Sequence, residues 1–252
     1  QAAMAQAADE KCDLVLTPEM TPLLDRRPGA LLAQSSFAED DPTLAQVSEL
    51  ARRFGIEVLL GSLAVKVDAH RLANRSVLFN RHGTLVAQYD KIHLFDVDLG
   101  QGERYQESAR FSAGDTAVVA RCAGYTLGMT VCYDLRFAQL YRDLAWAGAD
   151  ILAVPSAFTV PTGQAHWHTL LRARAIETGC FVLAPAQHGQ HDDGRITYGH
   201  SLVVNPWGEV IAEKREGTGL LMADLDLQQV QAARAKLPSL QHSRPYRVQT
   251  VA

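Results

Sequence analysis

Apolar residues along the chain recur in short runs that are rich in valine, isoleucine and leucine. Several of these runs are apolar throughout instead of alternating with polar residues, which is typical of strands covered on both faces. The pattern therefore predicts strands over residues 14–16, 56–65, 77–79, 85–89, 117–120, 127–131, 151–154, 181–184, 202–204, 210–212 and 220–223.

Helical periodicity, with apolar residues every three to four positions, marks several other segments. The first has the clearest end signals, because Asp41 and Pro42 suit the N-cap and first helical position and Gly55 suits the end. Helices mixed with strands throughout, and the lack of any linker or repeat, predict a single α/β domain over residues 1–252. We predict helices over 42–54, 137–147, 165–178 and 227–236, and tight turns at 81–83, 192–194 and 205–208.

Composition narrows the class of protein further. Of the 252 residues, 47% are hydrophobic and 21% are charged, which excludes a disordered chain, a collagen and a disulfide-rich mini-protein. The net charge of −4 argues against a nucleic-acid partner, which would need a basic face. The longest apolar run, 180–184, is too short to span a membrane. The 4 scattered cysteines indicate reduced thiols in a cytoplasmic protein.

The sequence contains no motif for a cofactor. It has neither a glycine-rich dinucleotide fingerprint nor a phosphate-binding loop. It also lacks an H-E-x-x-H segment, and His166 and His168 would point to different sides of the predicted helix. We therefore expect no cofactor and no metal.

Three polar residues follow closely after predicted strands: Glu19 after 14–16, Lys91 after 85–89 and Cys132 after 127–131. Ligands of open α/β sheets bind at the carboxyl ends of strands, where an acid, a base and a thiol would converge. Cys132 also precedes a predicted helix, whose N-terminus would lower the pKa of the thiol. The residues alone leave open an alternative, in which Cys132 is a small buried core residue and the charges are solvated loop residues.

The segments around these residues are LTPE at 16–19, YDKIHLFD at 89–96 and VCYDLRF at 131–137, separated by 72 residues from Glu19 to Lys91 and 41 from Lys91 to Cys132. In order and spacing they resemble the nitrilase superfamily of carbon–nitrogen hydrolases, which carry a Glu-Lys-Cys triad. The resemblance covers nearly the whole chain, through PSAF at 155–158, TGQAHW at 162–167, LRARAIE at 171–177, YGHS at 198–201 and NPWGEV at 205–210.

This resemblance implies a four-layer α-β-β-α sandwich and cofactor-free hydrolysis of a small-molecule amide. Cys132 would be the nucleophile that forms a thioester, Glu19 the base, and Lys91, with the backbone N–H of Tyr133, the stabiliser of the oxyanion. The segment APAQ at 184–187 and the His166-Trp167 pair resemble the Nit branch and, within it, the Nit1-like amidases of deaminated glutathione. The alternatives are an ω-amidase for 2-oxoglutaramate, an N-carbamoyl amino acid hydrolase and an inactive scaffold of the same fold.

Two supporting residues are also implied by the resemblance. Glu107 matches a second glutamate beside the triad and is expected to orient Lys91 or the substrate amide. Arg136, four residues after Cys132, is expected to bind a substrate carboxylate. The alternatives are that Glu107 is a loop carboxylate and that Arg136 pairs with a nearby aspartate, Asp134 or Asp143.

Members of this superfamily usually pair through a helical face, so we expect a homodimer or a larger homo-oligomer. They begin with a strand followed by a helix, whereas residues 1–10 of this chain match only the end of that helix. We therefore expect a domain that is truncated at its N-terminus, and the loss of a strand would expose backbone groups of its neighbour.

Overall fold

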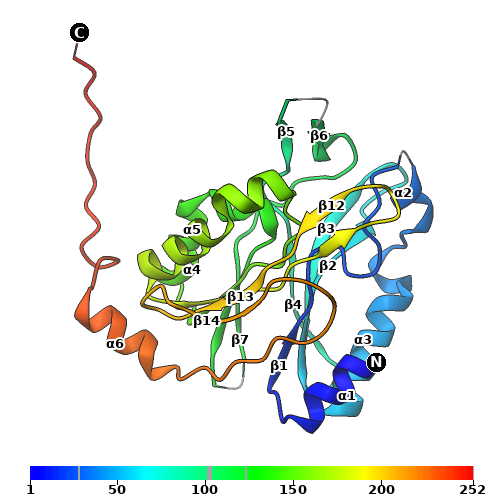
Figure 1. Ribbon diagram of the computed structural model, residues 1–252, viewed down its shortest axis with the longest axis horizontal. Coiled ribbons are helices and arrows are strands. Elements are labelled where there is room, and N and C mark those ends of the chain that lie inside the picture. The colour runs from blue at the N-terminus through cyan, green and yellow to red at the C-terminus, as the bar shows by residue number, and fades with distance from the viewer. Residues whose placement is uncertain (28, 101–103, 123, 252) are drawn as a thin grey trace.

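The computed structural model describes residues 1–27, 29–100, 104–122 and 124–251, which form two β-sheets with helices on their outer faces (Figure 1). The first sheet has the strand order β1-β2-β3-β4, in which β1 and β2 run parallel and the other neighbours antiparallel. Its strands are β1 (Leu14–Leu16), β2 (Glu57–Lys66), β3 (Leu72–Phe79) and β4 (Leu85–Asp90).

The second sheet has the strand order β14-β13-β10-β9-β8-β7. Its central strands β8, β9 and β10 are parallel, and the strands on either side of them are antiparallel. These strands are β7 (Val118–Arg121), β8 (Thr126–Met129), β9 (Ile151–Ala153), β10 (Phe181–Ala184), β13 (Ser201–Val204) and β14 (Val210–Lys214).

Helices cover both sheets from outside, which completes the expected four layers. In Figure 1, α1 (Ala2–Asp9) and α3 (Pro42–Phe54) lie on the side of the first sheet, whereas α4 (Ala138–Trp146) and α5 (Val160–Thr178) lie on the side of the second. The α-β-β-α sandwich predicted from the sequence is thus confirmed. None of the helices in the described part of the chain combines the length and hydropathy needed to cross a bilayer.

Strand β2 supplies side chains to two layers because successive residues point to opposite faces. Leu59 faces the second sheet and shares a core with Met129 and Leu152, whereas Val58 and Leu60 pack towards α1 and α3. Beyond a register shift between Leu60 and Leu63, the odd-numbered residues face the helices instead. A bulge of this kind changes which side chains enter a layer without ending the strand.

Gly61 lies within this irregularity and allows the chain after β1 to approach closely. A Cβ atom at Gly61 would lie 1.6 Å from the carbonyl oxygen of Thr17, so no larger residue fits without moving the backbone. The Gly61 N–H donates to Thr17 Oγ1 at 2.9 Å, and Ser62 Oγ accepts from the Met20 N–H at 2.9 Å. The bulge therefore holds the backbone before Glu19, at Thr17, and after it, at Met20.

The structure corrects several boundaries predicted from the sequence. Residues 220–223 form no strand, and α5 begins at Val160 instead of residue 165. One short hairpin was not predicted, β5 (Asp96–Asp98) with β6 (Arg104–Gln106). The turn predicted at 192–194 joins another hairpin, β11 (His188–Gln190) with β12 (Ile196–Tyr198), whose strands the apolar pattern did not mark. The remaining described elements are α2 (Ala30–Gln34), α6 (Gln228–Lys236) and the 3₁₀ turns η1 (Ala38–Asp40), η2 (Glu107–Ala109) and η3 (Cys132–Arg136).

Candidate active site

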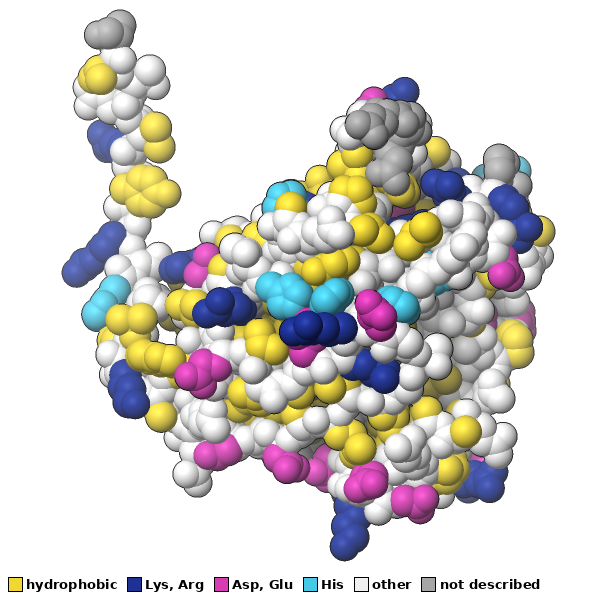
Figure 2. Space-filling view, in the orientation of Figure 1, with side chains coloured by type: hydrophobic (Ala, Val, Ile, Leu, Met, Phe, Trp, Pro, Cys, Tyr) yellow, Lys and Arg dark blue, Asp and Glu magenta, His cyan; other side chains and the backbone are white. Residues whose placement is uncertain are grey.

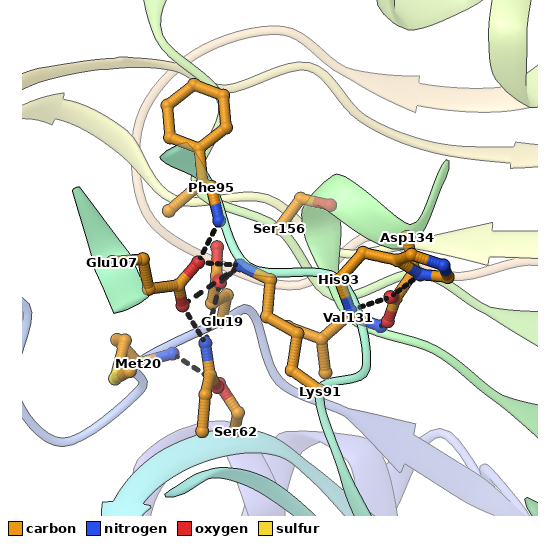
Figure 3. A network of polar contacts seen from close by, with 12 residues as sticks. Glu19, Met20, Ser62, Lys91, His93, Phe95, Glu107, Val131, Asp134 and Ser156 are labelled. Atoms are coloured by element: carbon orange, nitrogen blue, oxygen red, sulfur yellow. Dashed lines mark hydrogen bonds and ion pairs between the residues drawn. The ribbon is translucent and has the colours of Figure 1, made fainter. Parts of the chain in front are cut away.

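Glu19 and Lys91 meet beyond the ends of β1 and β4, and both side chains are buried. The Lys91 ammonium lies 3.0 Å from Glu19 Oε1 and 2.8 Å from Glu107 Oε2, so it is held between two carboxylates (Figure 3). The Phe95 N–H donates to Glu107 Oε2 at 2.6 Å and fixes that carboxylate in turn. Glu107 is therefore part of a buried network and not a solvated loop residue.

Asn74, on the buried face of β3, joins the two carboxylates from a second direction. Its Nδ2 donates to Glu19 Oε1 at 2.9 Å and to Glu107 Oε1 at 3.2 Å. Its main-chain oxygen accepts from the Lys91 N–H at 2.9 Å. No pattern in the sequence marks Asn74, because the next two residues of β3, Arg75 and Ser76, are polar as well.

Cys132 reaches the same point from the second sheet. It opens η3 directly after β8 and has a positive φ of 50°, which is uncommon for a residue other than glycine. Its N–H donates to the Pro155 oxygen at 2.9 Å, and its thiol is hydrogen-bonded to the Glu19 carboxylate and to the backbone of Ala157. The structure thus brings Glu19, Lys91 and Cys132 together.

The carboxylate of Asp134 ties the cysteine turn to the lysine loop. Its oxygens accept from the Val131 N–H at 2.8 Å, the His93 N–H at 3.0 Å and the Tyr89 hydroxyl at 2.7 Å. Two of these donors belong to the segment around Lys91, as Figure 3 shows for His93. Because Asp134 is fully buried and bonded to both sheets, it fixes the position of Cys132 relative to Lys91.

The charges of the site follow from burial and from these contacts. Burial opposes ionisation of Glu19, but Lys91 and the Cys132 hydrogen bond hold the pKa of the carboxyl below its usual value. Burial likewise opposes the charge of Lys91, yet Glu107 and Glu19 raise the pKa of the ammonium. Burial and the negative charge of Glu19 raise the pKa of the Cys132 thiol.

The expectation that the helix N-terminus lowers the pKa of Cys132 is therefore wrong. The segment that follows is a 3₁₀ turn of 5 residues, and a thiolate would be buried beside the Glu19 carboxylate. Burial next to the Glu19 carboxylate therefore favours the neutral thiol over the thiolate.

The N–H of Tyr133 is available at the start of η3. The first N–H groups of a helical turn lack partners within it, and no described residue accepts a hydrogen bond from Tyr133. Tyr133, Lys91 and Cys132 line one cavity of about 220 Å³. The cavity is also lined by the cations Arg26, Arg104, Arg110, Arg136 and Arg195.

Comparisons with known proteins agree with this geometry. A model of the family described as carbon-nitrogen hydrolase matches residues 1–235. The chain belongs to the carbon–nitrogen hydrolase family.

Relatives of this carbon–nitrogen hydrolase include a deaminated glutathione amidase of Yersinia enterocolitica, 41% identical over 92% of this chain and 82% of its own. The NitFhit protein of Caenorhabditis elegans has a similar structure, with a TM-score of 0.89 and 36% identity over 96% of this chain and 60% of that one. A mutant amidase from Nesterenkonia sp. AN1, with a TM-score of 0.78 and 29% identity over 94% of this chain and 89% of its own, carries acrylamide added at its active-site cysteine.

Arg136 of this carbon–nitrogen hydrolase is not paired with either aspartate considered in the sequence analysis. The Asp134 carboxylate accepts hydrogen bonds from Tyr89, His93 and Val131, and the Asp143 carboxylate accepts one from the Gln139 side chain. Among the described residues neither forms an ion pair with Arg136, so that alternative is wrong. The guanidinium instead contacts His166 Nδ1 at 3.2 Å and lies 5.6 Å from the centre of the Phe158 ring.

One group of described residues has the donor set of a metal site: His168, His200 and Glu213, whose ligand atoms lie within 4.8 Å of one another. Figure 2 shows histidines gathered on this face of the molecule. Both rings already contact the same Glu213 oxygen, at 2.9 and 2.7 Å, and their hydrogen bonds outweigh burial and lower the pKa of that carboxyl to about 2. These residues do not line the cavity with Cys132.

Proposed function

We propose that this enzyme hydrolyses a small amide, with deaminated glutathione as its substrate, through a thioester on Cys132. The observation that carries the proposal is the Glu19 carboxylate, which is hydrogen-bonded to the Cys132 thiol and to the Lys91 ammonium at 3.0 Å. A base, a nucleophile and a cation at the edge of one cavity are the groups that acyl transfer requires.

Acylation begins when the Cys132 sulfur attacks the amide carbon and its proton passes to Glu19. Proton transfer during the attack avoids a buried thiolate, whose formation the raised pKa of Cys132 opposes. The carbonyl oxygen becomes an oxyanion, which accepts hydrogen bonds from Lys91 and from the Tyr133 N–H. The C–N bond then breaks as Glu19 protonates the departing amine, leaving a thioester.

Deacylation repeats the same steps with water as the nucleophile. Glu19 takes a proton from a water molecule, which attacks the thioester carbon, and the oxyanion returns to the same two donors. When this second tetrahedral intermediate collapses, the C–S bond breaks and Glu19 returns a proton to sulfur. Lys91 and Glu107 remain paired throughout, so the cation stays in place for both halves of the reaction.

The choice of substrate rests on cavity charge and on relatives. Arg136 borders the cavity and has no carboxylate partner among the described residues, which suits the carboxylate of a 2-oxo acid amide. The Yersinia relative, 41% identical, is named for action on deaminated glutathione. A sister activity on 2-oxoglutaramate would use the same catalytic groups.

Substrate profiling tests this proposal directly. The purified enzyme is offered deaminated glutathione, 2-oxoglutaramate and an N-carbamoyl amino acid, and release of amine or ammonia is measured. We expect kcat/KM for deaminated glutathione to exceed that for the other two by about tenfold or more. Deaminated glutathione offers a second carboxylate to the arginines of the cavity, and one charged hydrogen bond contributes about this much. A higher value for either competitor would replace the proposed substrate, and inactivity on all three would favour a scaffold.

We further propose that the enzyme acts in the cytoplasm as a homodimer or larger homo-oligomer. Trp146 on α4 and Ile176 on α5 are 48% and 46% exposed on the outer helical layer, where apolar surface suits a second copy. Light scattering should give at least twice the mass of the chain, and Ile176→Asp should shift the protein towards monomer. A monomer at micromolar concentration would contradict the proposal.

A further inference from the structure

Arg195 is one of the arginines that line the cavity, and no motif in the sequence marks it. It lies between the turn of the β11–β12 hairpin and β12, and one terminal nitrogen donates to the carbonyl oxygen of Ala157, whose backbone also contacts the Cys132 thiol. The guanidinium carbon lies 5.6 Å from the centre of the Tyr105 ring. Both Arg195 and Tyr105 line the cavity of Cys132.

The guanidinium of Arg195 has donor capacity that the described protein does not use. Its Nε is buried and has no hydrogen-bond partner, and no described carboxylate forms an ion pair with it. The residue as a whole is half-buried, but a buried donor atom without an acceptor is unfavourable. A ligand carboxylate in the cavity would satisfy both the free donor and the charge.

The contacts of the hairpin place this cation on the Glu19 side of the cavity. Gln187, just before β11, donates to the Glu19 main-chain oxygen at 3.0 Å, and Asp193 accepts from the Arg26 N–H at 2.8 Å. The positive charge of Arg195 also helps to lower the pKa of Glu19. Arg136, by contrast, lies over the rings of Tyr133 and Phe158, where it contacts His166 instead of the segment around Glu19.

This location decides which part of the substrate meets each arginine. In the proposed mechanism Glu19 protonates the departing amine, so the amine portion of the substrate lies on the Glu19 side. Resting on that mechanism, we propose that Arg195 is a specificity-determining residue that binds a carboxylate at the end of the amine portion. Arg136 then binds the carboxylate of the acyl portion, and the enzyme selects amides with an anionic group at both ends.

A matched pair of substrates tests this assignment. Both are γ-amides of 2-oxoglutarate with the same dipeptide as the amine, and one ends in a carboxylate whereas the other ends in a carboxamide. For the wild-type enzyme we expect kcat/KM to favour the carboxylate by about 10- to 100-fold, through KM, because this contact forms in the ground state as well as in the transition state.

Arg195→Gln should remove this preference. We expect its kcat/KM for the carboxylate substrate to fall by about the same 10- to 100-fold, with the carboxamide changed by less than about threefold. Arg195→Lys, which keeps the charge but not the paired donors, should recover part of the preference. Arg136→Gln should weaken both substrates equally, and Arg53→Gln, a loss of charge on the distant helix α3, should change neither.

The outcomes separate this inference from the proposed function. If the wild-type enzyme hydrolyses both amides but Arg195→Gln weakens them equally or not at all, Arg195 is structural and the assignment is wrong. If the wild-type enzyme hydrolyses both without preferring the carboxylate, the assignment is also wrong. If it hydrolyses neither, the proposed function itself fails, and the role of Arg195 fails with it.

Discussion

Replacing Cys132 with alanine should lower kcat for amide hydrolysis by at least about 10⁴-fold, the scale seen when a covalent nucleophile is removed. The variant keeps Glu19, Lys91 and the Tyr133 N–H, so it retains oxyanion stabilisation but has no atom to form the thioester. The loss of one sulfur atom next to Glu19 should leave the fold intact. Release of amine measures the first effect, and thermal unfolding measures the second.

Cys180→Ala is the matched control for this experiment. Cys180 is also buried, but its sulfur contacts the Ala149 oxygen at 3.2 Å in the core, away from the cavity. We expect that variant to retain turnover and to lose some stability. Mass spectrometry of the wild-type protein with a slow substrate should detect the acyl adduct on Cys132. Turnover of the substrate by Cys132→Ala would contradict the mechanism.

Replacing Lys91 with methionine should remove activity and also destabilise the fold. The Lys91 side chain is 2% exposed and contacts Glu19 and Glu107, so its loss leaves a buried and a half-buried carboxylate without their cation. Removal of one partner from a buried charge network costs about 3–5 kcal/mol. Chemical unfolding at pH 7 measures this loss, and kcat measures the loss of oxyanion stabilisation.

Two comparisons make the Lys91 prediction sharper. The double variant Lys91→Met/Glu107→Gln should recover part of the stability, because one carboxylate is gone, but none of the activity. Lys91 lowers the pKa of Glu19, so the pair stabilises the folded state above the ordinary carboxyl pKa and less as pH falls. The stability gap between wild type and Lys91→Met should therefore shrink below about pH 4.5. A gap that is independent of pH would contradict this account.

Local signals in the sequence predicted much of the secondary structure. The helix over 42–54 is confirmed with the same ends, because Asp41 caps Thr43 and Leu44 and Gly55 adopts the left-handed conformation that ends it. The parallel centre of the second sheet likewise follows from runs that are apolar throughout, such as β10. Each of these signals lies within a few residues of the element that it predicts.

Features set by distant contacts were missed or misjudged. Strands as short as β11 and β12 have no clear period, and residues 220–223 are apolar without finding a strand partner among the described residues. The pKa of Cys132 depends on burial and on Glu19, which is 113 positions away in the chain. Arg195 shows no local sign of its role, because its place in the cavity depends on how the hairpin docks.

The division of the site between two sheets has a consequence for turnover. The proposed base and cation extend from the first sheet, whereas the nucleophile extends from the second. A small slide of one sheet along the other would change the gap between sulfur and carboxylate without touching any group that meets the substrate. Side chains packed between the sheets, such as Leu59, Leu78 and Met129, therefore set the alignment of the reacting atoms. In this fold the packing of the core between the sheets therefore controls the distance between the nucleophile and its base.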